Sequence, residues 1–254
     1  MFNKNLVVTL ILLVFMSGCA TTKAPITGRT QIMLISPAQE TSMGEKSYKD
    51  VLSKSKLSKD KKQIDMVNRV GKKIAKVAEK LYQVNYNWEF NVIQSKQLNA
   101  WCMPGGKVAV YTGIFKAIEN EDQLAVVMSH EIAHALARHG AERMSMAQIS
   151  SIGQALGSMA MNSYSPKYTK VFNVAYGLGS QYGVMMPYGR QQETEADTIG
   201  LYLMRDANYD LSEAVKLWKN MKKLSGPSQP EFLSTHPSTD RRIEDIQKTI
   251  TLIK

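Results

Sequence analysis

The chain has 254 residues, of which 44% are hydrophobic and 21% are charged, and its formal net charge is +10. A domain of this size buries most of the surface that its unfolded chain exposes, so its core needs no disulfide framework. The 32 basic residues are mixed with 22 acidic residues. Because no basic run is interleaved with aromatic residues, the composition argues against nucleic-acid binding and is compatible with attraction to anionic lipid.

The N-terminus has the features of an export signal. Lys4 precedes an apolar run, 6–16, that is too short for an ordinary membrane-spanning helix of about 20 residues. Met16-Ser17-Gly18-Cys19 resembles the lipobox of bacterial lipoproteins. The resemblance implies cleavage before Cys19, lipidation of Cys19 and, because Ala20 rather than Asp follows, sorting to the outer membrane. The alternative is a plain signal peptide with an incidental cysteine.

The remaining chain predicts a mostly helical α+β domain with a small antiparallel or mixed sheet. Apolar periodicity and turn residues predict helices at about 36–54, 60–81, 121–139, 190–206, 211–224 and 237–252, and strands at about 86–92, 99–103 and 108–111. The Gly-, Ser-, Met- and Tyr-rich stretch at 150–190 is interpreted as a helix followed by a flexible, partly apolar loop. We expect a signal peptide at 1–18, a lipid anchor and tether at 19–35, and a single domain at 36–254.

The predicted 121–139 helix contains a metal-binding motif, His130-Glu131-Ile132-Ala133-His134. Residues 130 and 134 differ by about 40° around a helix, so both imidazoles leave the same face, as two ligands of a tetrahedral zinc ion require. Glu131 is adjacent and can take a proton from a zinc-activated water. The motif therefore predicts one Zn²⁺ per chain, with Glu131 as the base.

A catalytic zinc ion takes a third protein ligand, and the residues leave its identity open. His236, a carboxylate and Cys102 are the candidates. His139 lies nine residues after His130, so a continuous helix turns it about 180° away and makes it a poor ligand. We expect Cys102 to be a buried and unreactive thiol.

Arg190-Gln191-Gln192-Glu193-Thr194-Glu195-Ala196-Asp197, followed by Gly200, resembles the E-x-x-A-D helix of gluzincin peptidases of the HtpX and CAAX-prenyl-protease type. The resemblance implies a zincin-like fold in which Glu193 is the third zinc ligand. It also implies that Asp197 hydrogen-bonds a zinc histidine. Positions 193 and 197 share one helix face, whereas Glu195 is about 200° from Glu193 and is expected to point away.

Other segments carry the resemblance over nearly the whole mature chain. The hairpin from Asn99-Ala100-Trp101 to Thr112-Gly113 is similar to the family's edge strand, which implies substrate binding by β-addition near Asn99 and Ala100. The stretch 27–40 resembles the lipoprotein branch, the LoiP- and BepA-like proteins, without the BepA repeat domain. His236 begins an H-P-x-x-x-R element that ends at Arg241.

Three roles are open for His236. It can donate to the transition-state oxyanion, bind zinc as a fourth ligand that closes the site, or cap the last helix. In the second case, the 150–190 and 225–236 loops are expected to form a movable lid.

These features predict a zinc endopeptidase of the bacterial cell envelope, anchored through Cys19 at the periplasmic face of the outer membrane. By analogy, its substrates are misfolded or misassembled exported proteins. One alternative is a lipoprotein chaperone or assembly factor with a latent or self-inhibited zinc site. Another is a membrane-surface binding protein, which predicts no bound metal. The physiological substrate, the oligomeric state and the activation signal do not follow from the sequence.

Overall fold

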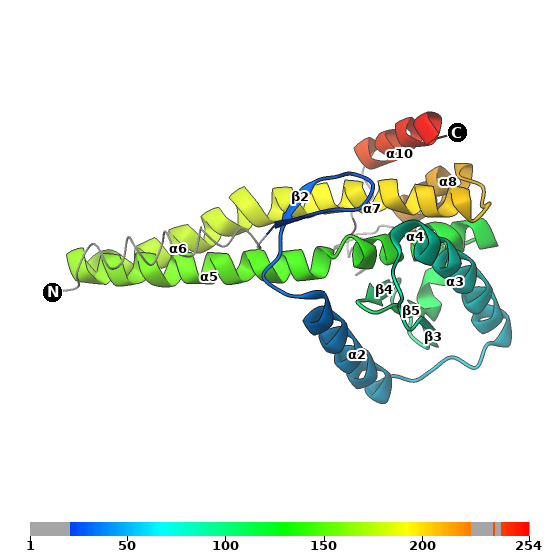
Figure 1. Cartoon of the computed structure of the whole chain (residues 1–254), viewed down its shortest axis with the longest axis horizontal. Coiled ribbons are helices and arrows are strands. Elements are labelled where there is room, and N and C mark those ends of the chain that lie inside the picture. The colour runs from blue at the N-terminus through cyan, green and yellow to red at the C-terminus, as the bar shows by residue number, and fades with distance from the viewer. Residues whose placement is uncertain (1–20, 225–235, 237–239, 254) are drawn as a thin grey trace.

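The computed structural model describes residues 21–224, 236 and 240–253. Eleven helical segments or turns and five strands are ordered along these residues, and the helices dominate (Figure 1). The predicted fold class, a mostly helical α+β domain with a small mixed sheet, is confirmed. Among these residues, none of the helices combines the length and the apolar character that crossing a bilayer requires.

The first half of the domain follows the predicted order closely. Helix α2 (Pro37–Lys54) begins with a capping box in which the Ser36 side chain accepts from the Gln39 amide. Helix α3 (Lys61–Tyr82) buries one stripe, as its three- and four-residue apolar spacing predicts. Strands β3 (Glu89–Ile93), β4 (Ala100–Met103) and β5 (Lys107–Tyr111) follow.

These three strands form one sheet in the order β3-β5-β4. Strand β5 is parallel to β3 and antiparallel to β4. The segment after α2 covers the outer edge of β3, because the Ser58 amide donates to the Val92 carbonyl at 2.8 Å and the Gln94 amide donates to the Lys56 carbonyl at 2.7 Å. Strand β4 is therefore the edge strand of this sheet.

The core lies between the sheet and a layer of helices. Helix α4 (Glu121–Leu136) is buried from Gln123 to Leu136 and packs against α3, β4 and α7 (Met186–Asp206). The Asn120 side chain caps α4 by accepting from the Gln123 amide at 2.8 Å. Helices α8 (Ser212–Leu224) and α10 (Asp240–Ile253) complete the layer.

The stretch 150–190 differs from its predicted loop. Helix α5 (His139–Tyr164) is followed by the short turn η2 (Pro166–Tyr168), helix α6 (Thr169–Ser180) and the π-helical turn η3 (Gln181–Met185), which leads into α7. Figure 1 shows α5 and α6 side by side, projecting from the rest of the domain. The loop prediction was wrong because glycine and serine were taken as loop formers, whereas Gly153 and Gly157 are sites of close helix packing.

The segment expected to be a tether contributes to the folded domain. Strands β1 (Thr21–Lys23) and β2 (Thr30–Ile32) form an antiparallel pair, and the Gln31 side chain donates to the Ala137 carbonyl at 2.7 Å. Gln31, Met33 and Ile35 are buried. Cys19 and residues 1–18 lie outside the described residues.

Candidate metal centre

Two histidines of α4 point to the same place. The Nε2 atoms of His130 and His134 are 3.1 Å apart, as the predicted one-turn spacing requires. Both side chains are buried in a helix whose neighbours are apolar. Neutral imidazoles that converge in such surroundings need a shared partner, because unpaired buried polar groups are costly.

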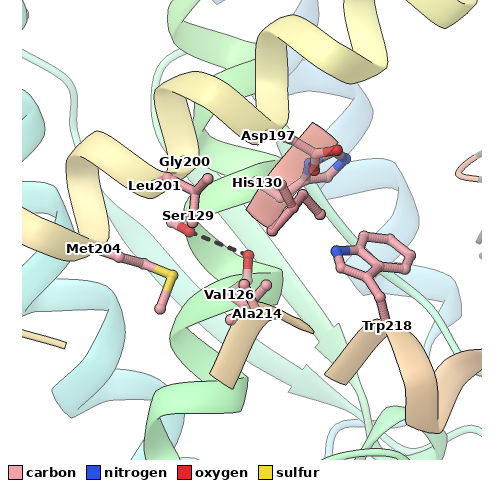
Figure 2. A pocket seen from close by; sticks show the side chains of 10 residues that line it. Val126, Ser129, His130, Asp197, Gly200, Leu201, Met204, Ala214 and Trp218 are labelled. Atoms are coloured by element: carbon pink, nitrogen blue, oxygen red, sulfur yellow. Dashed lines mark hydrogen bonds and ion pairs between the residues drawn. The ribbon is translucent and has the colours of Figure 1, made fainter. Parts of the chain in front are cut away.

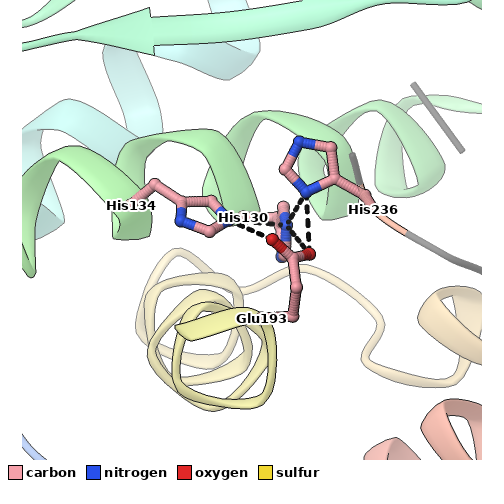
Figure 3. Close-up of side chains that lie close together, drawn as sticks. All are labelled: His130, His134, Glu193 and His236. Carbon is pink, nitrogen blue, oxygen red and sulfur yellow. Dashed lines mark hydrogen bonds and ion pairs between the residues drawn. The ribbon is translucent and has the colours of Figure 1, made fainter. Parts of the chain in front are cut away.

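Two further side chains complete a four-residue cluster (Figure 3). Glu193 reaches it from α7, with Oε1 3.3 Å from His134 Nε2 and Oε2 3.3 Å from His130 Nε2. The Nδ1 atom of His236 lies 3.1 Å from His130 Nε2 and 2.7 Å from Glu193 Oε2. One donor atom from each of the four residues lies within 4.8 Å of the others.

These distances fit a tetrahedral zinc site. Ligand atoms at about 2.0–2.1 Å from Zn²⁺ lie about 3.3 Å from one another in a tetrahedron. The measured separations between donor atoms range from 2.7 to 3.3 Å. Three imidazoles and one carboxylate are also the donor types that zinc prefers. These separations cover five of the six ligand pairs, and one donor atom from each residue lies within 4.8 Å of the others, so the residues present fit a zinc ion.

The charge state of Glu193 suits a metal ligand. Burial by itself raises the pKa of a carboxyl group, but hydrogen bonds with His130, His134 and His236 hold the pKa of Glu193 well below its usual range. The carboxylate is therefore ionised whenever the three rings surround it.

Asp197 orients His130, as its position one turn after Glu193 predicts. Its Oδ1 atom lies 2.9 Å from His130 Nδ1, which places the ring proton on Nδ1 and leaves Nε2 free to bind a metal. Burial opposes ionisation of Asp197, but Arg242 and His130 lower its pKa. Burial lowers the pKa of His130, but the Asp197 and Glu193 carboxylates outweigh this effect and raise the pKa to about 9.

Arg242 is a member of this site that the sequence did not reveal. Its guanidinium donates to both Asp197 oxygens, at 2.7 and 2.8 Å, and its Cζ atom lies 3.6 Å from the centroid of the Trp218 ring. The arginine of the H-P-x-x-x-R element, Arg241, is instead 90% exposed. The arginine that reaches the centre is thus the residue directly after this element.

His139 also lies close to the centre, contrary to the prediction that it faces away. Its Nδ1 atom is 2.7 Å from Nδ1 of His134. The helix does not continue to His139, because α4 ends at Leu136 and Arg138 adopts a left-handed φ of 56°. The Arg138 guanidinium is held by Glu40 at 2.6 Å and by the Ile35 carbonyl at 2.7 Å, which stabilises this break.

A buried ion network continues from His139. Its Nε2 atom lies 2.9 Å from Glu195, which points away from Glu193 as predicted. Arg29 bridges Glu195 and Glu142, with its shortest contacts at 2.6 and 2.7 Å. Although burial opposes ionisation, contacts with His139, Arg29 and Thr27 lower the pKa of Glu195 to about 2. When His134 binds metal through Nε2, its Nδ1 proton is donated to His139, which in turn donates to Glu195.

Glu131 lies beside the cluster but outside it. Its Oε1 atom is 3.5 Å from Nε2 of His236 and has no hydrogen-bond partner among the described residues. Burial raises the pKa of Glu131, an effect that His236 and His130 oppose. The geometry is that of a base whose acceptor atom faces a centre where water and substrate meet.

The close approach of α7 to α4 depends on Gly200. A Cβ atom at this position would lie 3.2 Å from the backbone nitrogen of His130. Figure 2 shows Gly200 beside Ser129, and Asp197 beside His130. A larger residue at 200 would push α7, and with it Glu193, away from the histidines.

The remaining predicted site residues lie on the neighbouring sheet. Ala100 begins edge strand β4, and the Asn99 carbonyl accepts from the Tyr111 amide at 2.9 Å. Cys102, the third candidate ligand, lies on the same strand and is not part of the four-residue cluster. Burial raises the pKa of the Cys102 thiol, as expected for an unreactive cysteine.

The contact between Asp197 and His130 predicts an effect on metal affinity. We expect Asp197→Ala to lower zinc affinity by about 10- to 100-fold, because the His130 ring loses the carboxylate that fixes its proton and orientation. Competition with a chromogenic chelator measures the affinity. Thr198→Ala, at the partly exposed next position of α7, serves as the control. Equal zinc affinity in the two variants would contradict the role of Asp197.

The Arg29 network predicts a pH-dependent stability. We expect Arg29→Met to lower the free energy of unfolding by roughly 3 kcal/mol at neutral pH, because two buried carboxylates lose their cation. The pKa of Glu195 is lowered to about 2 in the folded protein, so the stabilisation is complete above about pH 4.5 and is lost as pH falls towards 2.

Urea unfolding with chelator present throughout measures this effect, and the difference from the unmodified chain is expected to shrink on acidification. Arg69→Met is the matched control, because Arg69 makes an exposed ion pair with Glu121 at 2.8 Å, and exposed pairs contribute little to stability. If the unfolding free energies of Arg29→Met and the unmodified chain differ by the same amount from pH 7 to pH 3, the assigned network is ruled out.

Comparison with known proteins identifies the family. The model of the family described as "Peptidase family M48" matches residues 62–250. The mitochondrial metalloendopeptidase OMA1 of Schizosaccharomyces pombe is 34% identical, over 88% of this chain and 65% of its own length. The human mitochondrial metalloendopeptidase OMA1 is 28% identical, over 89% of this chain and 45% of its own length.

The β-barrel assembly-enhancing protease of Escherichia coli K12 is 30% identical, over 96% of this chain and 51% of its own length. This chain thus spans between about half and two thirds of the length of these relatives. The match covers α3 to α10 and includes every residue of the four-residue cluster. The chain belongs to peptidase family M48, which confirms the predicted metallopeptidase and its zinc cofactor.

Proposed function

We propose that this chain is a zinc endopeptidase of the bacterial cell envelope that cleaves internal peptide bonds of exported proteins. The observation that carries the proposal is the position of Glu131, whose Oε1 atom makes no hydrogen bond among the described residues and lies 3.5 Å from Nε2 of His236, a member of the four-residue cluster. A structural zinc site does not need such a base. The relatives named as metalloendopeptidases support cleavage within chains rather than at their ends.

His130, His134 and Glu193 hold the metal in this proposal. Zinc supplies Lewis-acid activation of water and of the scissile carbonyl. Glu131 accepts a proton from the attacking water at Oε1 and returns it to the nitrogen of the leaving amine. Burial raises the pKa of Glu131, and a raised pKa favours both the acceptance and the return of the proton near neutral pH.

Edge strand β4 is proposed to bind the substrate backbone. Its inner edge pairs with β5, and the described strands put no neighbour on its other edge. An extended substrate that adds to this edge is held by main-chain hydrogen bonds, which suits an enzyme that accepts many sequences. Asn99 and Ala100 are proposed to lie nearest the scissile bond.

We propose that His236 acts as a fourth ligand in the conformation described. Its Nδ1 atom lies within the donor cluster, at distances matching those between the other ligand atoms. A site with four protein ligands has no open position for water. The peptidase would then rest in a self-inhibited state, and a substrate or activator would have to displace His236. The predicted 225–236 lid lies mostly outside the described residues.

The location and the substrate class are proposed from the N-terminal sequence and from one relative. The lipobox at Met16–Cys19 supports a lipid anchor at Cys19 and the periplasmic face of the outer membrane. One relative is named as a protease that enhances β-barrel assembly, which supports misassembled envelope proteins as substrates of this chain too. A lipoprotein chaperone or assembly factor is the second candidate function, and the closed arrangement of His236 is the observation that favours it.

The position of Glu131 predicts how the two functions can be separated. We expect Glu131→Gln to reduce casein cleavage by about 10²- to 10⁴-fold while zinc content stays at one ion per chain, because the amide cannot accept the proton. Glu244→Gln, on the exposed face of α10, is the matched control. If the unmodified chain and the Glu131 variant cleave casein equally slowly, and both support envelope integrity, the chaperone function is favoured.

The position of His236 predicts a gain of activity on substitution, the opposite of the loss expected for Glu131→Gln. We expect His236→Ala to increase casein cleavage several-fold and to weaken zinc binding, because the fourth position becomes open to water. A donor to the oxyanion would instead lose about 10²- to 10³-fold in activity on removal, and that result would eliminate self-inhibition. The double variant with Glu131→Gln shows whether any gained activity comes from this site.

A further inference from the structure

The helical hairpin formed by α5 and α6 has no core of its own. No residue from 146 to 191 is buried, although this stretch is almost entirely helical. Among residues 21–224, 236 and 240–253, the rest of the domain contacts the hairpin near its base, where Glu142 and Ser145 of α5 are buried. Isolated helices gain most of their stability from packing an apolar face, so a long exposed hairpin calls for a surface that covers it.

Each helix of the hairpin carries an exposed apolar stripe. The side chains recur at spacings of three and four residues and are between 45 and 64% exposed. We call this set the outer stripe: Ile152, Leu156 and Met159 on α5, and Val171, Val174 and Leu178 on α6. Contiguous apolar surface of this kind marks a site of contact with protein or membrane.

The contacts between the two helices are polar or involve small residues. The Ser150 and Ser180 hydroxyls are 2.7 Å apart, and the Ser158 hydroxyl bonds the Asn173 side chain. A side chain on Gly157 would collide with the ring of Phe172. Phe172 and Tyr176 of α6 thus pack on the small residues Gly157 and Gly153 of α5, while the aliphatic side chains of the outer stripe are left exposed. Small and polar residues at helix contacts are common among helices that associate in lipid.

The charges of the hairpin favour an anionic partner. Between Arg143 and Arg190 the only charged residues are Lys167, in the turn η2 that joins the helices, and Lys170, in the first turn of α6. Tyr168 lies between them, and the Lys167 ammonium lies 4.8 Å from the centroid of its ring. Lysine and tyrosine are the residues that sit at the headgroup level of membranes.

We propose that the α5–α6 hairpin lies on an anionic phospholipid surface, with the outer stripe in the boundary between headgroups and acyl chains and Lys167 and Lys170 near the phosphates. A lipid layer takes up exposed apolar side chains without needing a matching protein surface, and its anionic headgroups suit the two lysines. The exposed polar residues between the apolar ones, such as Ser151 and Asn162, suit a shallow position. The proposal depends neither on lipidation of Cys19 nor on catalysis.

A local probe tests the proposal in the full zinc-loaded chain. An environment-sensitive fluorescent amino acid is placed at Leu178, and in a control protein at Leu252, which is 85% exposed on α10. With vesicles of phosphatidylglycerol and phosphatidylethanolamine carrying brominated acyl chains, we expect a blue shift and quenching at 178 and neither at 252. Absence of quenching at 178 overturns the proposal, as does a blue shift that appears without lipid as protein concentration rises.

Substitution of the outer stripe provides the second measurement. In the protein labelled at 178, we expect most of the quenching to be lost when Ile152, Leu156, Val171 and Val174 are changed to Gln. The matched control changes four exposed apolar residues elsewhere to Gln and is expected to keep the quenching: Met43, Leu57, Leu81 and Leu252. We expect each of Lys167→Gln and Lys170→Gln to reduce the preference for phosphatidylglycerol over phosphatidylcholine about five-fold. Equal quenching in the two four-residue variants overturns the proposal.

Discussion

The packing of α7 on α4 is the contact on which the rest of the structure depends. It brings Glu193 to two histidines that lie about 60 positions earlier in the chain, and Gly200 allows the approach because no Cβ stands between α7 and the His130 backbone. Metal ligands tolerate errors of only a few tenths of an ångström. The site is therefore built on two rigid helices whose separation is set by backbone contact rather than by side chains that can move.

Helix α7 does more than supply one ligand, because three of its carboxylates act on the centre in different ways. Glu193 enters the cluster, Asp197 orients His130 directly, and Glu195 acts on His134 through His139. Each orienting carboxylate is buried and has its own arginine, Arg242 for Asp197 and Arg29 for Glu195. These arginines come from opposite ends of the chain, so ion pairs connect both ends to α7. Without these pairs, burial of the charged carboxylates would be strongly unfavourable.

The sequence predicts what short-range patterns determine. The capping residues and apolar spacing of α2, α3 and α4 are local, and the one-turn spacing of His130 and His134 follows from helix geometry alone. Glu193 required a resemblance, because nothing local separates it from the other acids of α7. Arg29 and Arg242 left no local signal, since their partners are more than 40 positions away. The misplacement of His139 came from one residue, Arg138, whose left-handed conformation is imposed by its contacts with Glu40 and Ile35.

The hairpin and the metal centre are joined without an intervening loop. Four residues lie between His134 and His139, where α5 begins, and Glu193 lies seven residues into α7, about 10 Å along its axis from the π-helical turn that ends the hairpin. Both helices of the hairpin are thus connected directly to helices that hold the ligands: α5 follows α4, and α6 leads through the π-helical turn into α7. A hairpin seated on lipid would therefore fix the height and orientation of the centre above the membrane, because helices transmit position along their axes with little bending. The edge strand β4 packs against α4, so the proposed substrate groove would be held in the same frame.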